Sequence, residues 1–211
     1  MANTATNVTA GKPKVEGAIY TALKSAGLTL PTDTDTALAS GYECVGYVSE
    51  DGVKRSKEIS SESIKAWGGD TVMRTRTAND SNFTFKMIEY LAKIVQQVVY
   101  GSANVTGTLA TGMAIQDKPS YSGEDRVWVI DQIMTGNVKC RIVIPDAVVT
   151  AVSEIAYKDN EAAGYEITLG TIPDATGVTV YEYLKAPAAT VSGESGVSGE
   201  SGASGESGST N

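Results

Sequence analysis

The sequence predicts a mainly β protein, an antiparallel β-sandwich or barrel-like domain with one packed α-helix. Apolar and polar residues alternate over many short segments, as they do in strands with one buried face. Gly, Asn, Asp and Pro stand between these segments, where turns are expected. One stretch alone has the apolar spacing of an amphipathic helix. With 211 residues and 41% hydrophobic content, the chain can bury the core of one domain.

The N-terminal part is expected to form an arm, a strand and a loop. Residues 1–15 show no periodicity and predict an extended arm that is ordered only where it docks on a neighbour. Apolar and β-prone residues follow at 17–23 and predict a strand. The segment 30–35, Leu-Pro-Thr-Asp-Thr-Asp, interrupts this pattern and indicates a surface loop.

A hairpin and a long loop are expected next. Residues 41–49 alternate as in a strand, and the following Glu-Asp-Gly suits a tight turn into a return strand at 53–59. From 60 to 70 the chain is rich in Ser, Glu, Lys and Gly. Because Ile64 and Trp67 are its main apolar residues, this segment predicts a long loop with two apolar anchors.

A polar strand and the expected helix occupy the middle of the chain. Residues 71–77 alternate but carry little apolar surface on either side. The segment 83–87 alternates Phe, Phe and Met with polar residues, as a strand does. From Ile88 the apolar residues follow helical spacing, and Gly101 is expected to end this helix as its C-cap.

The C-terminal half of the domain predicts a hairpin and two further strands. A Gly-Asn pair between 126–135 and 138–144 suits a two-residue turn of the primed type. Pro145 is expected to end the second strand, because proline cannot donate to a sheet. Alternation recurs at 165–169 and at 178–184.

The predicted β domain covers residues 16–186, and residues 187–211 form a separate tail. This tail contains three copies of Ser-Gly-Glu-Ser-Gly, with Gly at every third position. Collagen has the same period, but here no Pro occupies the intervening positions and the tract is short. We expect a flexible solvated tail on the outer surface that assembly does not require.

The charge of the chain excludes several classes of protein. Lys and Arg number 17 against 25 Asp and Glu, a net charge of -8, so nucleic acid and anionic membranes repel the chain. A sequence-reading DNA-binding protein is therefore not expected. The first residues form no apolar leader, and no run of residues is long and apolar enough for a membrane span. We expect a soluble protein assembled in the cytoplasm, with no membrane partner.

Residues for catalysis are missing from the sequence. With no His, triads of Ser and His are impossible and the commonest general base is absent. The pairs Glu50-Asp51 and Glu124-Asp125 fit solvated turns better than glycoside hydrolysis. Cys44 and Cys140 lie in apolar segments and are expected to be small buried side chains. The sequence predicts no enzyme, no cofactor and no metal site.

A basic cluster and one tryptophan remain as candidate contact residues. Stacking aromatics do not interleave the basic residues, so ion pairs within or between subunits are preferred over nucleic-acid contacts. Trp67 is either an anchor of its own loop or a contact with another subunit. The candidate inter-subunit or inter-ring contacts are Lys54, Arg55, Lys57, Ile64, Trp67, Arg74 and Arg76.

Several fragments, taken in their order and spacing, make the chain resemble the major tail tube proteins of long-tailed bacteriophages. The resemblance covers about residues 11–185. It rests on Gly11-Lys12-Pro13, Gly17-Ala18-Ile19-Tyr20, Leu30-Pro31-Thr32-Asp33, the segment 46–52, Ala66-Trp67-Gly68-Gly69, the passage 83–101, the segment 165–169, Pro173-Asp174 and Glu182-Tyr183.

This resemblance implies a structural protein that forms hexameric rings, whose sheets join into a continuous inner β-barrel and whose rings stack into a tube for DNA ejection. It further implies that the segment 54–70 is a stacking loop between rings. The implied partners are other copies of the chain and the tape measure, terminator and distal tail proteins. Since residues 1–186 without the C-terminal tail are still acidic, we expect a lumen that DNA crosses without specific binding.

Two other classes stay open. A tail terminator, or the ring protein of a secretion tube, would share the fold and differ in how far it polymerises. A carbohydrate-binding or adhesion β-sandwich would expose aromatic residues on its loops, whereas here Trp67 and Tyr121 stand nearly alone among Ser, Thr, Asp and Gly.

Overall fold

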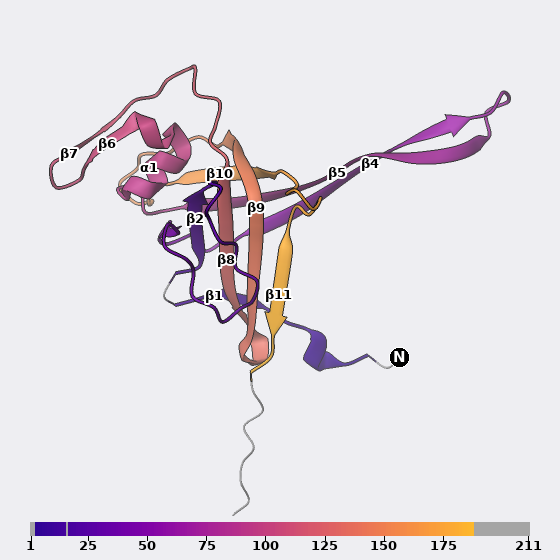
Figure 1. Ribbon diagram of the computed structural model, residues 1–211, viewed down its shortest axis with the longest axis horizontal. Helices are drawn as coiled ribbons and strands as arrows, with labels where there is room; N and C mark the ends of the chain where they lie inside the picture. The colour runs from indigo at the N-terminus through magenta and orange to yellow at the C-terminus, as the bar shows by residue number, and fades with distance from the viewer. Residues whose placement is uncertain (1–2, 16, 188–211) are drawn as a thin grey trace, which may run out of the picture.

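The computed structural model describes residues 3–15 and 17–187, and in this range it is a mainly antiparallel β structure (Figure 1). The expected tail at 187–211 lies outside the described residues apart from Pro187. A nine-stranded sheet contains β1 (Gly11–Pro13), β2 (Ile19–Leu23), β3 (Glu43–Cys44), β4 (Lys54–Lys65), β5 (Thr71–Met87), β8 (Arg126–Met134), β9 (Val138–Val152), β10 (Tyr165–Thr171) and β11 (Tyr181–Lys185). A small second sheet pairs β6 (Val105–Thr108) with β7 (Gly112–Ile115). The helices are α1 (Lys93–Tyr100) and the short 3-10 turns η1 (Ala5–Asn7), η2 (Ser102–Asn104) and η3 (Thr135–Asn137). The predicted fold class is confirmed.

The hairpin β8–β9 is the centre of the large sheet. Its turn follows the expected chemistry, because Gly136 and Asn137 both have positive φ, although the loop holds three residues instead of two. β2 and the arm strand β1 pair with the outer edge of β8. β11 and then β10 pair in succession with the outer edge of β9, and β5 and β4 follow beyond β10.

Pro145 does not end β9, contrary to the sequence prediction. The strand continues to Val152, and Pro145 stands where the register with β8 shifts between Arg126 and Trp128. Proline is tolerated at such a bulge because its missing N–H interrupts no regular ladder. The next residue, Asp146, is buried, and its carboxylate accepts a hydrogen bond from Lys24.

The hydrophobic core is packed between the bent sheet and α1. Trp128 is fully buried and meets Phe85 edge to face, with ring centroids 5.6 Å apart. From the helix, Val95 and Val98 bury their side chains in the same cluster. The other members include Ile19, Phe83, Met87, Ile144, Ile167 and Leu169. Alternation along β5 and β10 therefore predicts the core correctly.

The helix is shorter than expected and begins at Lys93 instead of Ile88. The Ile88 N–H still donates to the Tyr47 carbonyl, as in a strand, at 3.0 Å. Glu89 accepts the Tyr47 N–H through its carboxylate at 2.8 Å, which holds this segment against its neighbour. Gly101 ends the helix as predicted, with φ of 92° and its N–H on the Gln97 carbonyl.

Tyrosines attach α1 to β10. The Tyr165 hydroxyl is buried and donates to Gln96 Oε1 at 3.0 Å, and the Tyr165 ring stacks on Tyr90 with centroids 5.3 Å apart. Gln96 is itself fully buried. Burial is the main reason why the pKa of Tyr165 is raised above its ordinary value.

The expected hairpin of 41–49 with 53–59 is wrong. Glu43–Cys44 pairs with β2, while Val48 bridges to Met87 and Lys54 pairs with Thr84. Residues on both sides of the Glu-Asp-Gly turn therefore pair with the same strand, β5. The turn does form, because Gly52 has a positive φ and its N–H donates to the Ser49 carbonyl. It leads the chain into β4 and does not join two paired strands.

Candidate assembly surface

The most exposed element of the described chain is the hairpin β4–β5, whose outer half extends beyond the sheet body as a long two-stranded arm (Figure 1). Every residue of β4 is exposed, and so are residues 71–77 of β5. The second half of β5, from Phe83 to Met87, alternates buried and half-buried residues. One strand thus runs from solvent into the core.

The structure corrects the long loop predicted at 60–70. Residues 60–65 belong to β4 and pair with 71–78 of β5, so the expected stacking loop at 54–70 is a hairpin with a short turn. The turn is closed by the Ala66 N–H on the Asp70 carbonyl at 2.8 Å. Its Gly68 and Gly69 have φ of 120° and 101°, values that other residues rarely adopt. Because the strands bury nothing, no hydrophobic alternation marked them in the sequence.

Trp67 stands at the tip of this hairpin and is fully exposed, at 107% of its reference area. It does not anchor its own loop, so of the two sequence interpretations only the contact with another subunit remains open. A two-stranded hairpin that packs against no other element is only marginally stable in water. Both observations make the hairpin a candidate surface for binding a partner.

The outer part of the hairpin has two different faces. Residues directly opposite one another in an antiparallel pair lie on the same face. Ile64 is opposite Met73, and both are more than half exposed, so they form an apolar pair on one face. Arg74 is opposite Ser63 and Arg76 is opposite Ser61, which puts both guanidinium groups on the other face.

The predicted contact residues separate into base and tip. All seven lie on β4, β5 or the turn between them. Arg55, at the base, is used within the chain: it contacts Glu182 at 3.2 Å and covers the Phe83 ring. Within residues 3–15 and 17–187, no ion pair engages Lys57, Arg74 or Arg76. Residues 71–77 are exposed because the hairpin projects from the sheet body. Their exposure is therefore no evidence that they line a lumen.

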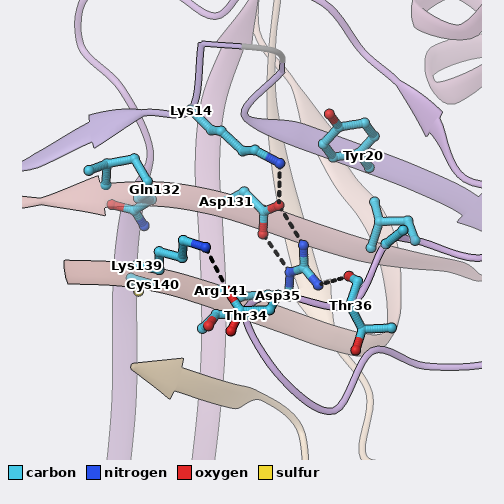
Figure 2. Close-up of a pocket in the computed structure, with 13 residues that line it drawn as sticks. Lys14, Tyr20, Thr34, Asp35, Thr36, Asp131, Gln132, Lys139, Cys140 and Arg141 are labelled. Carbon is cyan, nitrogen blue, oxygen red and sulfur yellow. Dashed lines mark hydrogen bonds and ion pairs between the residues drawn. The ribbon is translucent and has the colours of Figure 1, made fainter. Parts of the chain in front are cut away.

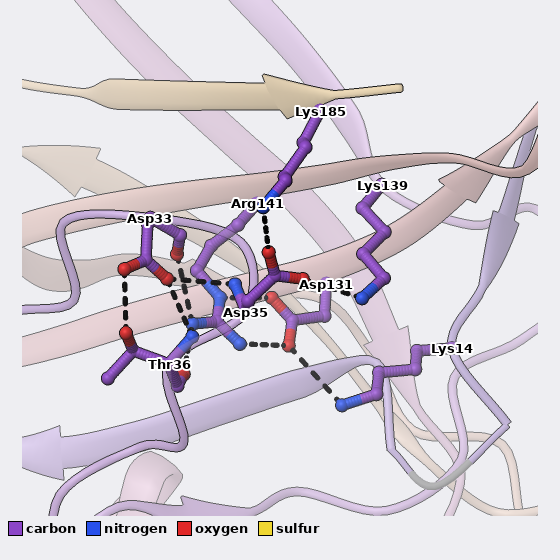
Figure 3. A network of polar contacts seen from close by, with 8 residues as sticks. All are labelled: Lys14, Asp33, Asp35, Thr36, Asp131, Lys139, Arg141 and Lys185. Carbon is purple, nitrogen blue, oxygen red and sulfur yellow. Dashed lines mark hydrogen bonds and ion pairs between the residues drawn. The ribbon is translucent and has the colours of Figure 1, made fainter. Parts of the chain in front are cut away.

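A buried ion pair on the opposite part of the sheet was missed by the sequence prediction. Arg141 and Asp131 face each other across β8–β9, with Nε to Oδ1 at 2.7 Å and Nη2 to Oδ2 at 2.8 Å (Figure 3). The remaining Arg141 donor, Nη1, binds the carbonyls of Asp33 and Thr36 at 3.1 and 2.7 Å. The two-residue turn predicted from the sequence would have paired Asp131 with Ile142, and only the three-residue loop 135–137 brings Asp131 opposite Arg141.

This ion pair fastens the segment 33–36, which we call the strap, over the sheet. Asp35 of the strap accepts hydrogen bonds from Lys139 of β9 at 2.6 Å and from Lys185 of β11 at 2.5 Å. These two lysines lower the pKa of Asp35 to about 2. The hydrogen bond to Asp131 raises the pKa of Arg141.

A cavity of about 380 Å³ lies beside the strap, and five of its thirteen lining residues are charged groups that already pair with one another (Figure 2). Cys140 is one of its lining residues, and burial raises the pKa of this thiol to about 11, so it is a poor nucleophile. Both cysteines are free thiols, Cys140 buried and Cys44 half-buried.

The described residues contain neither a metal cluster nor a helix that could span a membrane. Among residues 3–15 and 17–187, no three His, Cys, Asp or Glu side chains come together as a metal site would need. None of the helices in these ranges combines the length and apolar character that crossing a bilayer requires.

Comparisons with known proteins give one strong match. The family model described as phage tail tube protein matches residues 1–192. A search of the curated proteins finds no match. Among solved structures, the chain is similar to the "anti-feeding prophage cap (AFP tube terminating cap)", with 12% identity, coverage of 86% of this chain and 98% of that chain, and a TM-score of 0.37. This structural likeness is too weak to carry an argument.

Proposed function

The chain belongs to the phage tail tube protein family, and on this premise we propose that it forms hexameric rings that stack into the conduit for DNA ejection. The family is structural, so the chain is not an enzyme, and its place is the virion tail. The observation that supports stacking is the outer part of β4–β5, which exposes Trp67, Ile64 and Met73 without any core of its own. Apolar side chains presented in this way need a partner surface.

The proposal assigns separate roles to the two ends of the hairpin. Lys57, Arg74 and Arg76 form ion pairs with acidic groups of another subunit, and Ile64 and Trp67 supply the apolar part of the contact. Lys54 and Arg55 belong to the base, where Arg55 already binds Glu182. A contact between unlike surfaces repeats without closing and so produces an open-ended stack.

The acidic composition supports a lumen that does not retain DNA. Without the tail, the 17 basic residues face 22 acidic ones. Carboxylates facing the channel would remove the attraction that counterion release gives to basic proteins. A map of the assembled tube with a lumen dominated by Lys and Arg would contradict this part.

The direct test is electron microscopy of the purified protein at high concentration. We expect rings or hollow tubes. A variant in which Asn-Gly replaces residues 61–77, joining Ser60 to Ala78 across their native pair, should fold and fail to stack. A second variant keeps the full length of the hairpin and replaces Ile64, Trp67 and Met73 with Ser. It tests whether stacking needs these apolar side chains or only the presence of the hairpin.

The matched control is Leu184→Ser, an apolar residue of similar exposure, 63%, on β11. It should leave stacking intact. Isolated rings that never stack would favour the tail terminator alternative. Monomers at all concentrations would contradict the tube proposal, and so would tubes that form equally well without residues 61–77.

A further inference from the structure

A second cavity lies between α1 and β2, at the end of the molecule opposite the hairpin tip (Figure 1). We call it the helix cavity. It measures about 350 Å³, within the range of sites that hold a compact ligand. Its lining includes Ala22, Leu23, Leu28, Glu43, Ile94 and Arg126.

The helix cavity has fewer charged lining residues than the cavity beside the strap. The cavity beside the strap is lined by five charged residues that already pair with one another, so a large apolar group would displace existing ion pairs there. The helix cavity has two charged residues, Glu43 and Arg126, and its other side chains are four aliphatic and five uncharged polar ones. An aromatic side chain would therefore lose less by entering it.

Arg126 is incompletely satisfied within its own chain. It is 3% exposed, and its Nη2 donates to Ser102 Oγ at 2.7 Å and to Glu124 Oε2 at 2.9 Å. Its Nε has no hydrogen-bond partner among the described residues. A desolvated guanidinium is a favourable neighbour for an indole ring, through a cation–π contact.

The hairpin and the rest of the chain carry opposite net charges. The hairpin from Lys54 to Asp80 carries six basic and four acidic residues, a net charge of +2. The rest of the chain up to Pro187 carries eleven basic and eighteen acidic residues, a net charge of -7. A second copy of the chain therefore attracts the hairpin.

We propose that Trp67 of one copy inserts into the helix cavity of the next copy and contacts Arg126. This inference rests on the proposed stacking and names the surface that receives the hairpin tip. The Glu43 carboxylate at this cavity is an acceptor for the indole N–H. Since the donor and acceptor surfaces are at opposite ends, each copy offers both, and the contact repeats along the stack.

Site-directed disulfide formation tests the contact. In a Cys44→Ser, Cys140→Ala background, Trp67→Cys is combined with Leu28→Cys, which lines the helix cavity, or with Leu38→Cys, which lines the cavity beside the strap and is likewise half-buried. Mild oxidation of assembled and of concentrated unassembled protein is followed by non-reducing electrophoresis. We expect a ladder of covalent multimers with Leu28→Cys and at least tenfold less with Leu38→Cys.

The outcomes separate this inference from the proposed function. Tubes without a Leu28→Cys cross-link, or with an equal or stronger one at Leu38→Cys, overturn the cavity assignment and leave the tube standing. Cross-linked dimers without tubes overturn the tube and keep the contact. Tube formation is judged on the Cys44→Ser, Cys140→Ala chain that keeps Trp67, and the absence of tubes there together with the absence of the cross-link overturns both. The Trp67→Phe variant should stack better than Trp67→Ala, because an aromatic ring is retained.

Discussion

The two halves of β5 make opposite uses of the same strand geometry. From Phe83 to Met87 alternate side chains are buried against α1 and β10, whereas residues 71–77 are exposed on both faces. The inner half is stabilised by burial within its own chain. The outer half has backbone pairing to β4 and little else, so its stability depends on what it binds. In this chain, therefore, a segment can be a strand without contributing side chains to the hydrophobic core.

The largest expected contrast comes from truncating one apolar residue in each half. Phe85→Ala should lower the free energy of unfolding by about 3–5 kcal/mol, because it leaves a cavity against Trp128. Met73→Ala, in the exposed half, should change it by less than about 0.5 kcal/mol. Chemical denaturation of unassembled protein measures both. Equal losses would show that the hairpin has a core of its own.

Substitution of a charged group should likewise have a large effect on stability in the sheet body and a small one in the outer half of β5. Asp131→Ala leaves the buried Arg141 without its partner and should cost about 3–5 kcal/mol of unfolding free energy. Arg76→Gln should leave that free energy almost unchanged. The double variant Asp131→Leu, Arg141→Met should recover much of the loss. If Asp131→Ala had no effect, the strap would be held by other contacts.

A single buried hydrogen bond should have a smaller effect. Tyr165→Phe removes the donor to Gln96, which is fully buried, and should cost about 1–3 kcal/mol. Tyr157→Phe, whose residue is 69% exposed, serves as the matched control and should cost less than about 0.5 kcal/mol. Thermal unfolding followed by circular dichroism compares the two. A larger effect at Tyr157 would contradict the burial argument.

The smallest effect concerns the strap, which lies at the surface of the sheet body. Because the pKa of Asp35 falls from 3.8 to about 2 on folding, its ion pairs stabilise the native state above about pH 4 and are lost as the pH falls towards 2. The melting temperature of Asp35→Asn should therefore lie slightly below that of the parent at neutral pH and approach it as the pH falls through 2. A difference that does not shrink between pH 4 and pH 2 would exclude the ionised carboxylate as its cause.

Sequence patterns predicted those elements whose signals are local. The β8–β9 hairpin followed from its Gly-Asn turn, and the core half of β5 followed from its alternation. The strand character of 60–65 could not be predicted in this way, because it depends on pairing with β5 and leaves no apolar trace. The helix start also depended on a distant residue, Tyr47. For the candidate surface, the structure places all seven predicted residues on one hairpin, and their division between its two faces needed the register.

The continuity of β5 has a mechanical consequence. Its 17 residues span about 55 Å, and they join the tip of the hairpin to the core without a break. A tensile load applied at the tip along this strand pulls in shear on the bonds that β5 shares with β10, so many of them carry the load at once. β11, with five residues at its edge of β9, would instead peel one bond at a time when pulled sideways. A load transmitted between stacked subunits is thus carried in shear by the pairing of β5 with β10.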